Sequence, residues 1–155
     1  MKRTLTFGAA AILFTAGILA PMNLSAQSNE VIDEILEAEQ ISYAQAAYLL
    51  LIGSGNLDQD AAISAAHDAA EGSNFAQGYP ANQGLTLGEF SYIAMESFDV
   101  PGGMLYSMIP SPRYAARELE FRRVIQGNAY PNMPLSGDRA MRILGRLLTL
   151  QEEGR

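Results

Sequence analysis

The residues of this chain that could carry chemistry form an acidic segment with one histidine and an arginine-rich segment. Asn56, Asp58 and Asp60 alternate as the first ligands of a calcium-binding loop do. Position six of such a loop requires glycine and position twelve a bidentate glutamate, but this sequence has Ala61 and His67 there. Both differences remove what a calcium site needs. We therefore expect these polar side chains to lie at a helix N-terminus, where carboxylates complement the helix dipole.

His67 is the only histidine of the chain, and two carboxylates, Asp68 and Glu71, follow it within about one helical turn. A histidine beside a carboxylate can act as a general base if it also faces a substrate. No serine nucleophile motif lies near it in the sequence, and one histidine cannot supply a histidine-pair metal site. Because cysteine is absent, thiolate zinc sites and cysteine nucleophiles are excluded as well. We expect His67 to be a surface or partly buried side chain with an acidic neighbour.

All cations after residue 26 are arginines, and several of them recur at helical spacing. The candidate contacts for an anion or a binding partner are Arg113, Arg117, Arg139, Arg142 and Arg146. The first two share one helix face and the last three share another, because residues three, four or seven apart lie on one side of a helix. Guanidinium groups bind carboxylate and phosphate with paired donors. The alternative is that these arginines pair within the chain, with Glu118, Glu120 or the acidic first half.

Charge is divided unevenly along the 155 residues, whose formal net charge is -7. Residues 27–112 carry 12 acidic side chains and no basic one, whereas residues 113–155 carry eight arginines and five acidic side chains. An acidic total disfavours a nucleic-acid partner. Because regions of opposite charge attract, we expect the acidic half to dock on the arginine-rich half within one fold. The alternative is that the arginine face binds an external anion.

The first 26 residues have the three parts of a secretory signal peptide. Lys2 and Arg3 give a positive start, an uncharged apolar stretch runs from Leu5 to Ala20, and Ala26 offers a small residue for cleavage. The alternative, an uncleaved anchor, needs about 20 apolar residues, and this stretch is shorter. We predict cleavage after Ala26 and export to the periplasm or cell envelope, with no stable membrane insertion afterwards. Since no cysteine follows the cut, we expect no lipid anchor.

Hydrophobic periodicity predicts a single all-α domain over residues 27–155, because apolar residues recur at intervals of three and four. The predicted helices cover about residues 29–39, 42–52, 58–71, 86–98, 113–124 and 136–151, with one short helical turn between 101 and 112. Two hydroxyl residues have a glutamine or glutamate three positions later, which is the spacing of a capping box. The expected capping residues are Ser42, Gln45, Thr86, Glu89 and Ser136. The expected cap of the third helix is Asn56 or Asp58.

The helix starts recur along the chain. An apolar residue precedes a hydroxyl residue in Ile41-Ser42, Leu85-Thr86 and Leu135-Ser136, and a second apolar residue lies four positions after each hydroxyl. Such a pair forms a hydrophobic staple, which fixes the angle at which the chain enters the helix. The loops before the second and third starts also match, since each contains Gln-Gly followed by Tyr-Pro. This recurrence predicts three helix-pair repeats, at about 29–55, 56–98 and 99–151.

The last of these units resembles a degenerate S-layer homology repeat. Phe98-Asp99-Val100-Pro101 is similar to the start of that family's pattern, Val124-Ile125-Gln126-Gly127 to its central turn, and Pro134-Leu135-Ser136 to its final helix start. The likeness covers about residues 41–150 and is clearest over 98–150. It implies a helical module of three repeats that anchors exported proteins to cell-wall polymer. The basic residue of the family's helix start is replaced in all three units.

The sequence contains no recognisable nucleophile motif, no glycine-rich phosphate loop and no metal-ligand spacing. We therefore expect a non-catalytic, cofactor-free module that binds an envelope protein or a cell-wall polymer. The loops at about 72–85 and 99–112 should project together as the contact surface. Met104, Met108 and Met133, if exposed, would suit an adaptable protein contact. Two other functions stay open: a small periplasmic enzyme or accessory subunit that uses His67 and nearby carboxylates, and a carrier of an apolar ligand.

Overall fold

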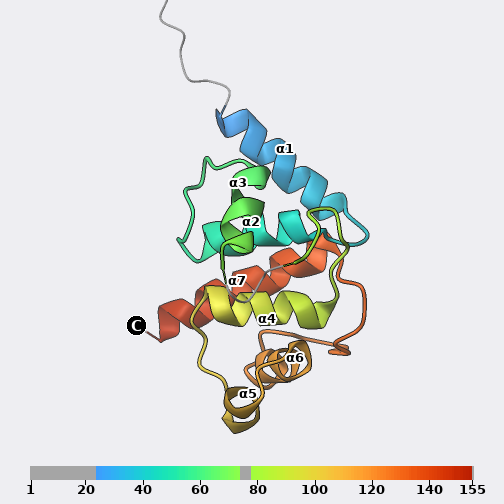
Figure 1. Ribbon diagram of the computed structural model, residues 1–155, viewed down its shortest axis with the longest axis vertical. Helices are drawn as coiled ribbons and strands as arrows, with labels where there is room; N and C mark the ends of the chain where they lie inside the picture. Colours follow the sequence, from blue (N-terminus) through green and yellow to red (C-terminus); the bar gives the residue numbers. More distant parts are fainter. Residues whose placement is uncertain (1–23, 74–77, 155) are drawn as a thin grey trace, which may run out of the picture.

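The computed structural model describes residues 24–73 and 78–154, and within these ranges the chain is helical (Figure 1). The helices are α1 (Leu24–Glu37), α2 (Tyr43–Gly53), α3 (Ile63–Glu71), α4 (Leu87–Ser97), α5 (Met104–Met108), α6 (Pro112–Phe121) and α7 (Gly137–Glu153). The only β-pairing in the described ranges is two isolated antiparallel bridges, Ser42 with Gly84 and Thr86 with Pro134. The prediction of an all-α fold is confirmed.

The predicted signal peptide lies outside the described residues, apart from its last three positions, which begin α1. In the part of the chain that is described, no helix has both the length and the apolar character that a membrane crossing requires.

The starts of α2 and α4 are fixed by the predicted capping boxes. The Ser42 hydroxyl accepts from the Gln45 backbone N–H at 3.3 Å, and the Gln45 side chain accepts from the Ser42 N–H at 3.0 Å. The same reciprocal pair joins Thr86 and Glu89, at 3.3 and 2.8 Å. Each box satisfies two backbone donors that a helix start would otherwise leave without a partner.

The start of α7 has the predicted residue at its cap but not the predicted capping bond. Ser136 is the N-cap residue, yet its side chain makes no capping hydrogen bond. Two features account for the difference. The third residue of the helix is Arg139, which has donors but no acceptor to return to the cap. The first N–H of the helix, that of Gly137, instead donates to the carbonyl of Ala38 at the end of α1, at 2.9 Å.

The predicted start of the third helix was wrong. The helix α3 begins at Ile63 instead of about residue 58, and its N-cap residue, Ala62, makes no side-chain bond. Asn56 caps nothing here, because its amide donates to the carbonyl of Ser97 at 3.1 Å and so ties this loop to the end of α4. Asp58 lies in a turn, with its carbonyl accepting from the N–H of Ala61 at 3.1 Å.

The residues that precede α2, α4 and α7 meet in the core and form a closed set of backbone hydrogen bonds. The N–H of Ile41 donates to Leu135, that of Leu85 to Ile41, and that of Leu135 to Leu85, at 2.8, 2.9 and 3.2 Å. All three side chains are fully buried. We call this set the backbone triangle. Three further bonds surround it, from Tyr43 to Gln83, Leu87 to Met133 and Gly137 to Ala38. The first residue of each of these helices therefore donates a backbone hydrogen bond to a segment that precedes a different helix.

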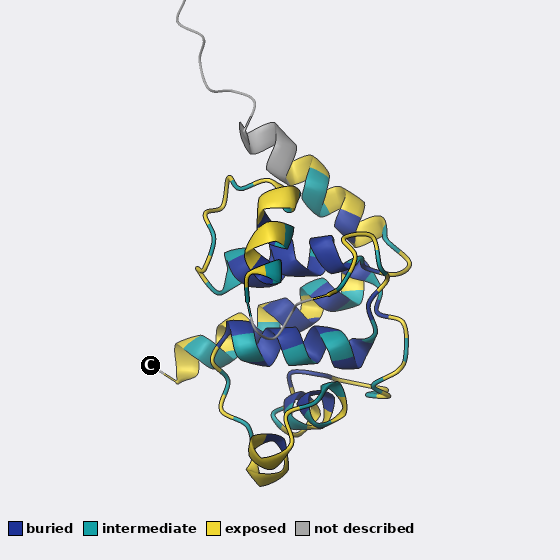
Figure 2. Ribbon diagram, in the orientation of Figure 1, coloured by how far each residue is buried: buried dark blue, intermediate teal, exposed yellow. Residues whose placement is uncertain are grey.

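The core lies where α2, α4 and α7 face one another (Figure 2). The helix α3 packs on α2, α6 packs on α4, and α1 packs on α7. Each predicted staple residue that follows a cap, Ala46, Phe90 or Ala140, is fully buried. The staples therefore bury their apolar partners in the same core that the backbone triangle occupies.

The helices α2, α4 and α6 end in the same kind of turn. The residue after each C-cap has a positive φ, namely 77° at Gly55, 49° at Asp99 and 61° at Arg123. The following N–H then bonds back to a carbonyl five residues earlier, as in a Schellman motif. Asp99 and Arg123 adopt a backbone conformation that usually favours glycine, so the turn is retained even where the residue type does not suit it.

Candidate functional site

The largest apolar side chains that face solvent gather at one end of the molecule, on α5 and the end of α6 (Figures 1 and 2). We call them the α5–α6 surface: Met104, Leu105, Met108, Ile109 and Phe121. Met104 is 77% exposed and Phe121 is 84% exposed. Single exposed apolar residues are ordinary, but a cluster of this kind on a small domain is a candidate contact site.

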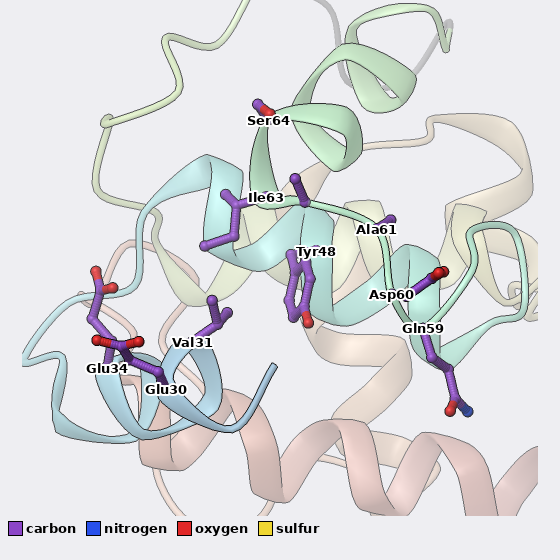
Figure 3. Close-up of a pocket in the computed structure, with 10 residues that line it drawn as sticks. Glu30, Val31, Glu34, Tyr48, Gln59, Asp60, Ala61, Ile63 and Ser64 are labelled. Carbon is purple, nitrogen blue, oxygen red and sulfur yellow. The ribbon is translucent and has the colours of Figure 1, made fainter. Parts of the chain in front are cut away.

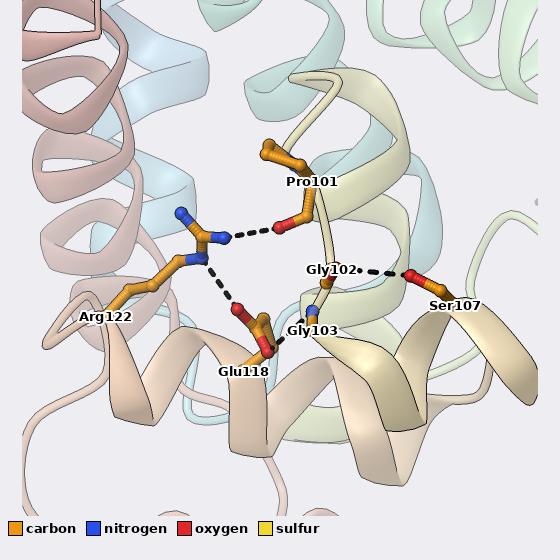
Figure 4. Close-up of polar contacts among 6 residues, drawn as sticks. All are labelled: Pro101, Gly102, Gly103, Ser107, Glu118 and Arg122. Carbon is orange, nitrogen blue, oxygen red and sulfur yellow. Dashed lines mark hydrogen bonds and ion pairs between the residues drawn. The ribbon is translucent and has the colours of Figure 1, made fainter.

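The helix α5 is held on α6 by polar contacts of Glu118 (Figure 4). One carboxylate oxygen of Glu118 accepts from the backbone N–H of Gly103 at 3.0 Å, and the other accepts from the Arg122 guanidinium at 2.9 Å. The same guanidinium donates to the carbonyl of Pro101. The Ser107 hydroxyl closes the turn by donating to the carbonyl of Gly102 at 3.2 Å. These bonds fix a five-residue helix that could not persist alone.

Tyr106 is the buried side chain of α5 and determines which residues face outward. Its hydroxyl donates to a carboxylate oxygen of Glu96 at 2.6 Å, and its ring lies 6.3 Å from that of Tyr92. Burial and the bond to Glu96 raise the pKa of Tyr106. A Cβ at Gly102 would lie only 2.2 Å from the Tyr106 ring, so glycine is needed there. With Tyr106 turned inward, the neighbouring apolar residues of α5 face solvent.

Two cavities adjoin the α5–α6 surface and share Arg117. The first, of about 250 Å³, lies between α5 and α6 and is lined by Met104, Leu105, Tyr114 and Phe121 among others. The second, of about 410 Å³, lies between α6 and the loop 127–131, where it is lined by Arg113 and by Tyr130. Both Arg113 and Arg117 are exposed. The exposed carboxylate of Glu120 lines the second cavity beside these two guanidinium groups, so the border of the apolar surface carries a net positive charge.

The predicted arginines of α7 are engaged by the chain itself. Arg139 donates to the backbone carbonyls of Gln126 and Asn128 and to the sulfur of Met133. Burial, together with the charge of Arg142, lowers the pKa of Arg139. Arg146 donates to the carbonyl of Val124 at 3.2 Å and to the Gln126 side chain at 3.1 Å, and Arg142 pairs with Asp138. Arg139 and Arg146 thus hold the turn after α6, and Arg142 pairs within its own helix. Within the part of the chain that the structure describes, the exposed arginines without an ion pair are Arg113, Arg117 and Arg123.

The acidic half packs on the arginine-rich half, but not through ion pairs. The helices α1 and α2 both contact α7. In the described ranges, the arginine ion pairs join Arg122 to Glu118 and Arg142 to Asp138, all within the second half. The two halves are joined by core residues such as Ile35, Leu50 and Leu147, and by hydrogen bonds that involve backbone groups, such as that from Ile41 to Leu135.

His67 joins α3 to the loop that follows it. Its Nε2 lies 3.3 Å from the carbonyl oxygen of Tyr79 and its Nδ1 lies 3.7 Å from a carboxylate oxygen of Asp68. The imidazole also stands edge-on to the ring of Tyr43, which stacks on that of Tyr79. Both ring nitrogens therefore face atoms of the chain, as expected for a partly buried histidine with an acidic neighbour.

We expect the stability of the protein to fall between pH 10 and pH 12 because of Tyr43. Burial, followed by the charge of Glu71 and the ring of Tyr79, raises the pKa of Tyr43 from 10.0 to about 12. Below pH 10 the phenol is protonated in both the folded and the unfolded chain, so it adds no pH dependence. Between the two values only the unfolded chain loses the proton, and the free energy of unfolding falls by at most about 1.4 kcal/mol per pH unit. Urea unfolding at several alkaline pH values should show a shallower decline for Tyr43→Phe; equal slopes would contradict this.

The two predicted contact loops do not form a joint surface. The described part of the first, residues 78–85, is bonded to the start of α2, with Gln83 and Ala81 accepting from Tyr43 and Ala44. The second carries α5 and is held to α6. In Figure 1 the two lie at different ends of the molecule, so the expectation that they project together was wrong.

The sequence pointed to part of the α5–α6 surface only. Met104 and Met108 are exposed as an adaptable contact requires, whereas Met133 is partly buried against Arg139. Phe121 was missed, although a signal exists: it falls four residues after Arg117 and so lies on the polar face of its helix.

No family model, curated protein or solved structure matches this chain.

Proposed function

We propose that this chain is an exported, non-catalytic module of the periplasm or cell envelope that binds a partner protein through the α5–α6 surface. The observation that carries the proposal is the exposure of five large apolar side chains on one short helix and its neighbour. Exposed methionine and phenylalanine form adaptable, strongly desolvated contacts in protein interfaces. The charge and hydropathy of the first 26 residues support export.

We further propose that the module consists of three helix-pair repeats similar to S-layer homology repeats. The backbone triangle supports this, because its members are the three apolar residues that precede the predicted caps. Positive φ at both Gly78 and Gly127 also supports it, since these glycines belong to the two matching Gln-Gly sequences. The spacing from Ser42 to the turn at Gly55 equals that from Thr86 to the turn at Asp99.

An anionic wall polymer is a second candidate ligand. The cavity of about 410 Å³ beside Arg113, Arg117 and Tyr130 favours it, because two exposed guanidinium groups outnumber the single carboxylate in the lining, that of Glu120, and an aromatic ring suits a sugar. The resemblance to S-layer homology repeats points to the same class of ligand. A catalytic role for His67 has less support, since both of its nitrogens face atoms of the chain. An apolar carrier has less support too, because the cavities described above lie at the surface.

The two ligands can be separated by retention of the mature protein on native envelope fractions. Leu105→Asp with Phe121→Asp should abolish retention if a protein contact is responsible, because each introduces a charge that must be desolvated. Leu36→Asp with Leu148→Asp is the matched control, because both are exposed apolar residues outside the α5–α6 surface and outside the cavity beside Arg113 and Arg117. Loss of retention only in Arg113→Ala with Arg117→Ala, and on protein-free wall sacculi, would instead assign the wall polymer. Retention unchanged in every variant would refute both.

A further inference from the structure

A second open surface feature lies at the end of the molecule that carries α1, in a groove between α1, α2 and the segment before α3 (Figure 3). The groove has a volume of about 420 Å³. Its border carries the carboxylates of Glu30, Glu34 and Asp60, and its walls include Val31 and Ile63. It is therefore a groove with an acidic border and an apolar interior.

Tyr48 places a polar group in the wall of this groove. Its side chain is only 5% exposed and forms part of the wall. Figure 3 shows its hydroxyl directed into the groove, and within the described ranges that hydroxyl has no hydrogen-bond partner. Tyr48 also lines a smaller adjoining cavity of about 240 Å³, whose walls include Leu49 and Ile52. A polar group held at the apolar base of a groove offers a hydrogen bond to whatever enters.

Among the described residues, no basic side chain lines this groove. Residues 27–112 contain no lysine or arginine. In the described ranges, the exposed arginines without an ion pair are Arg113, Arg117 and Arg123. They lie on α6 or just after it, beside the α5–α6 surface, which Figure 1 places at the opposite end of the molecule. An apolar surface with a cationic border and an apolar groove with an anionic border thus lie at two ends of one chain.

We propose that the α5–α6 surface of one copy docks into the acidic groove of a second copy, head to tail. The proposal rests on the proposed function, because it names the partner of that same surface. Phe121 and the α5 methionines supply the apolar contact, and Arg113 and Arg117 face Glu30 and Asp60 across its edge. Since the two surfaces differ, the contact is heterologous, and each added copy leaves one groove and one α5–α6 surface free. The product is an open chain of copies or a closed ring.

The test measures the molar mass of the mature protein by sedimentation equilibrium. It compares the wild type with two variants, one changed in the groove and the other in the α5–α6 surface. The groove variant is Glu30→Arg with Asp60→Arg, which spares Glu34 because that carboxylate accepts from Gln45 at 3.2 Å. The surface variant is Arg117→Glu with Phe121→Glu. The wild type should gain mass with protein concentration and lose it with salt, because the border charges are exposed. Each variant alone should remain at monomer mass, with a circular dichroism spectrum like that of the wild type.

An equimolar mixture of the two variants is the decisive sample. The groove variant keeps an intact α5–α6 surface and the surface variant keeps an intact groove, so the mixture should form a species of twice the monomer mass and no larger one. A wild type that stays monomeric at every concentration, or a mixture that does, overturns the inference. If the wild type is monomeric while Leu105→Asp with Phe121→Asp still loses envelope retention, self-association fails and the proposed function stands. If retention is also unaffected, both fail.

Discussion

Gly137→Ala should unfold the protein or lower its free energy of unfolding by at least about 3 kcal/mol. A Cβ at this position would lie 1.5 Å from the carbonyl oxygen of Ile35 and 2.6 Å from its carbonyl carbon. Both atoms belong to the backbone of α1, so no rotamer change relieves the overlap. The end of α1 would have to move away from α7, and the bond from the Gly137 N–H to Ala38 would be lost with it.

Gly145→Ala in the same helix is the matched control. No atom lies within 4 Å of a Cβ built there, so alanine should stabilise the protein by up to about 1 kcal/mol through helix propensity alone. Urea unfolding of both variants measures the difference. Similar free energies of unfolding for the two would show that α1 does not pack against the first residue of α7.

Leu135→Ala should cost about 2 to 5 kcal/mol, because the side chain is fully buried in the backbone triangle. The backbone bonds can persist, so the loss reports the cavity that the missing methyl groups leave. Leu148→Ala, at a position 37% exposed on α7, should cost much less. Chemical denaturation of the two variants provides the comparison.

A double-mutant cycle extends this experiment to the triangle itself. Leu85 and Leu135 are joined by a backbone hydrogen bond of 3.2 Å and are both fully buried. Their alanine substitutions should therefore be non-additive, since residues that share a cavity couple. Strict additivity, or a loss at Leu135 no larger than that at Leu148, would show that the helix starts do not share one core.

The helix starts that the sequence predicted correctly are those decided within four residues. Ser42 with Gln45 and Thr86 with Glu89 form their boxes because both partners lie in the same turn. The error at α3 has the opposite cause. Asn56 looks like a cap in sequence, but its amide bonds to Ser97, which is 41 residues away. No local pattern contains that partner.

The surroundings of the candidate binding residues were predicted less well, for the same reason. The spacing correctly placed Arg139, Arg142 and Arg146 on one helix. It did not identify the backbone carbonyls that Arg139 and Arg146 bind. Carbonyl groups are present at every residue, so sequence does not distinguish the ones that face a guanidinium. The outward face of α5 likewise depends on Glu118 and Glu96, which hold the helix from outside its own segment.

The backbone triangle also limits how this architecture can grow. Each of its three members donates its N–H to one of the other two and accepts a hydrogen bond at its carbonyl from the third. An open-ended solenoid accepts another unit at either tip, whereas here a fourth unit would find no unused donor or acceptor at the centre. We therefore expect homologous chains that are longer than this one to have longer segments between the helix starts and still to have three such starts.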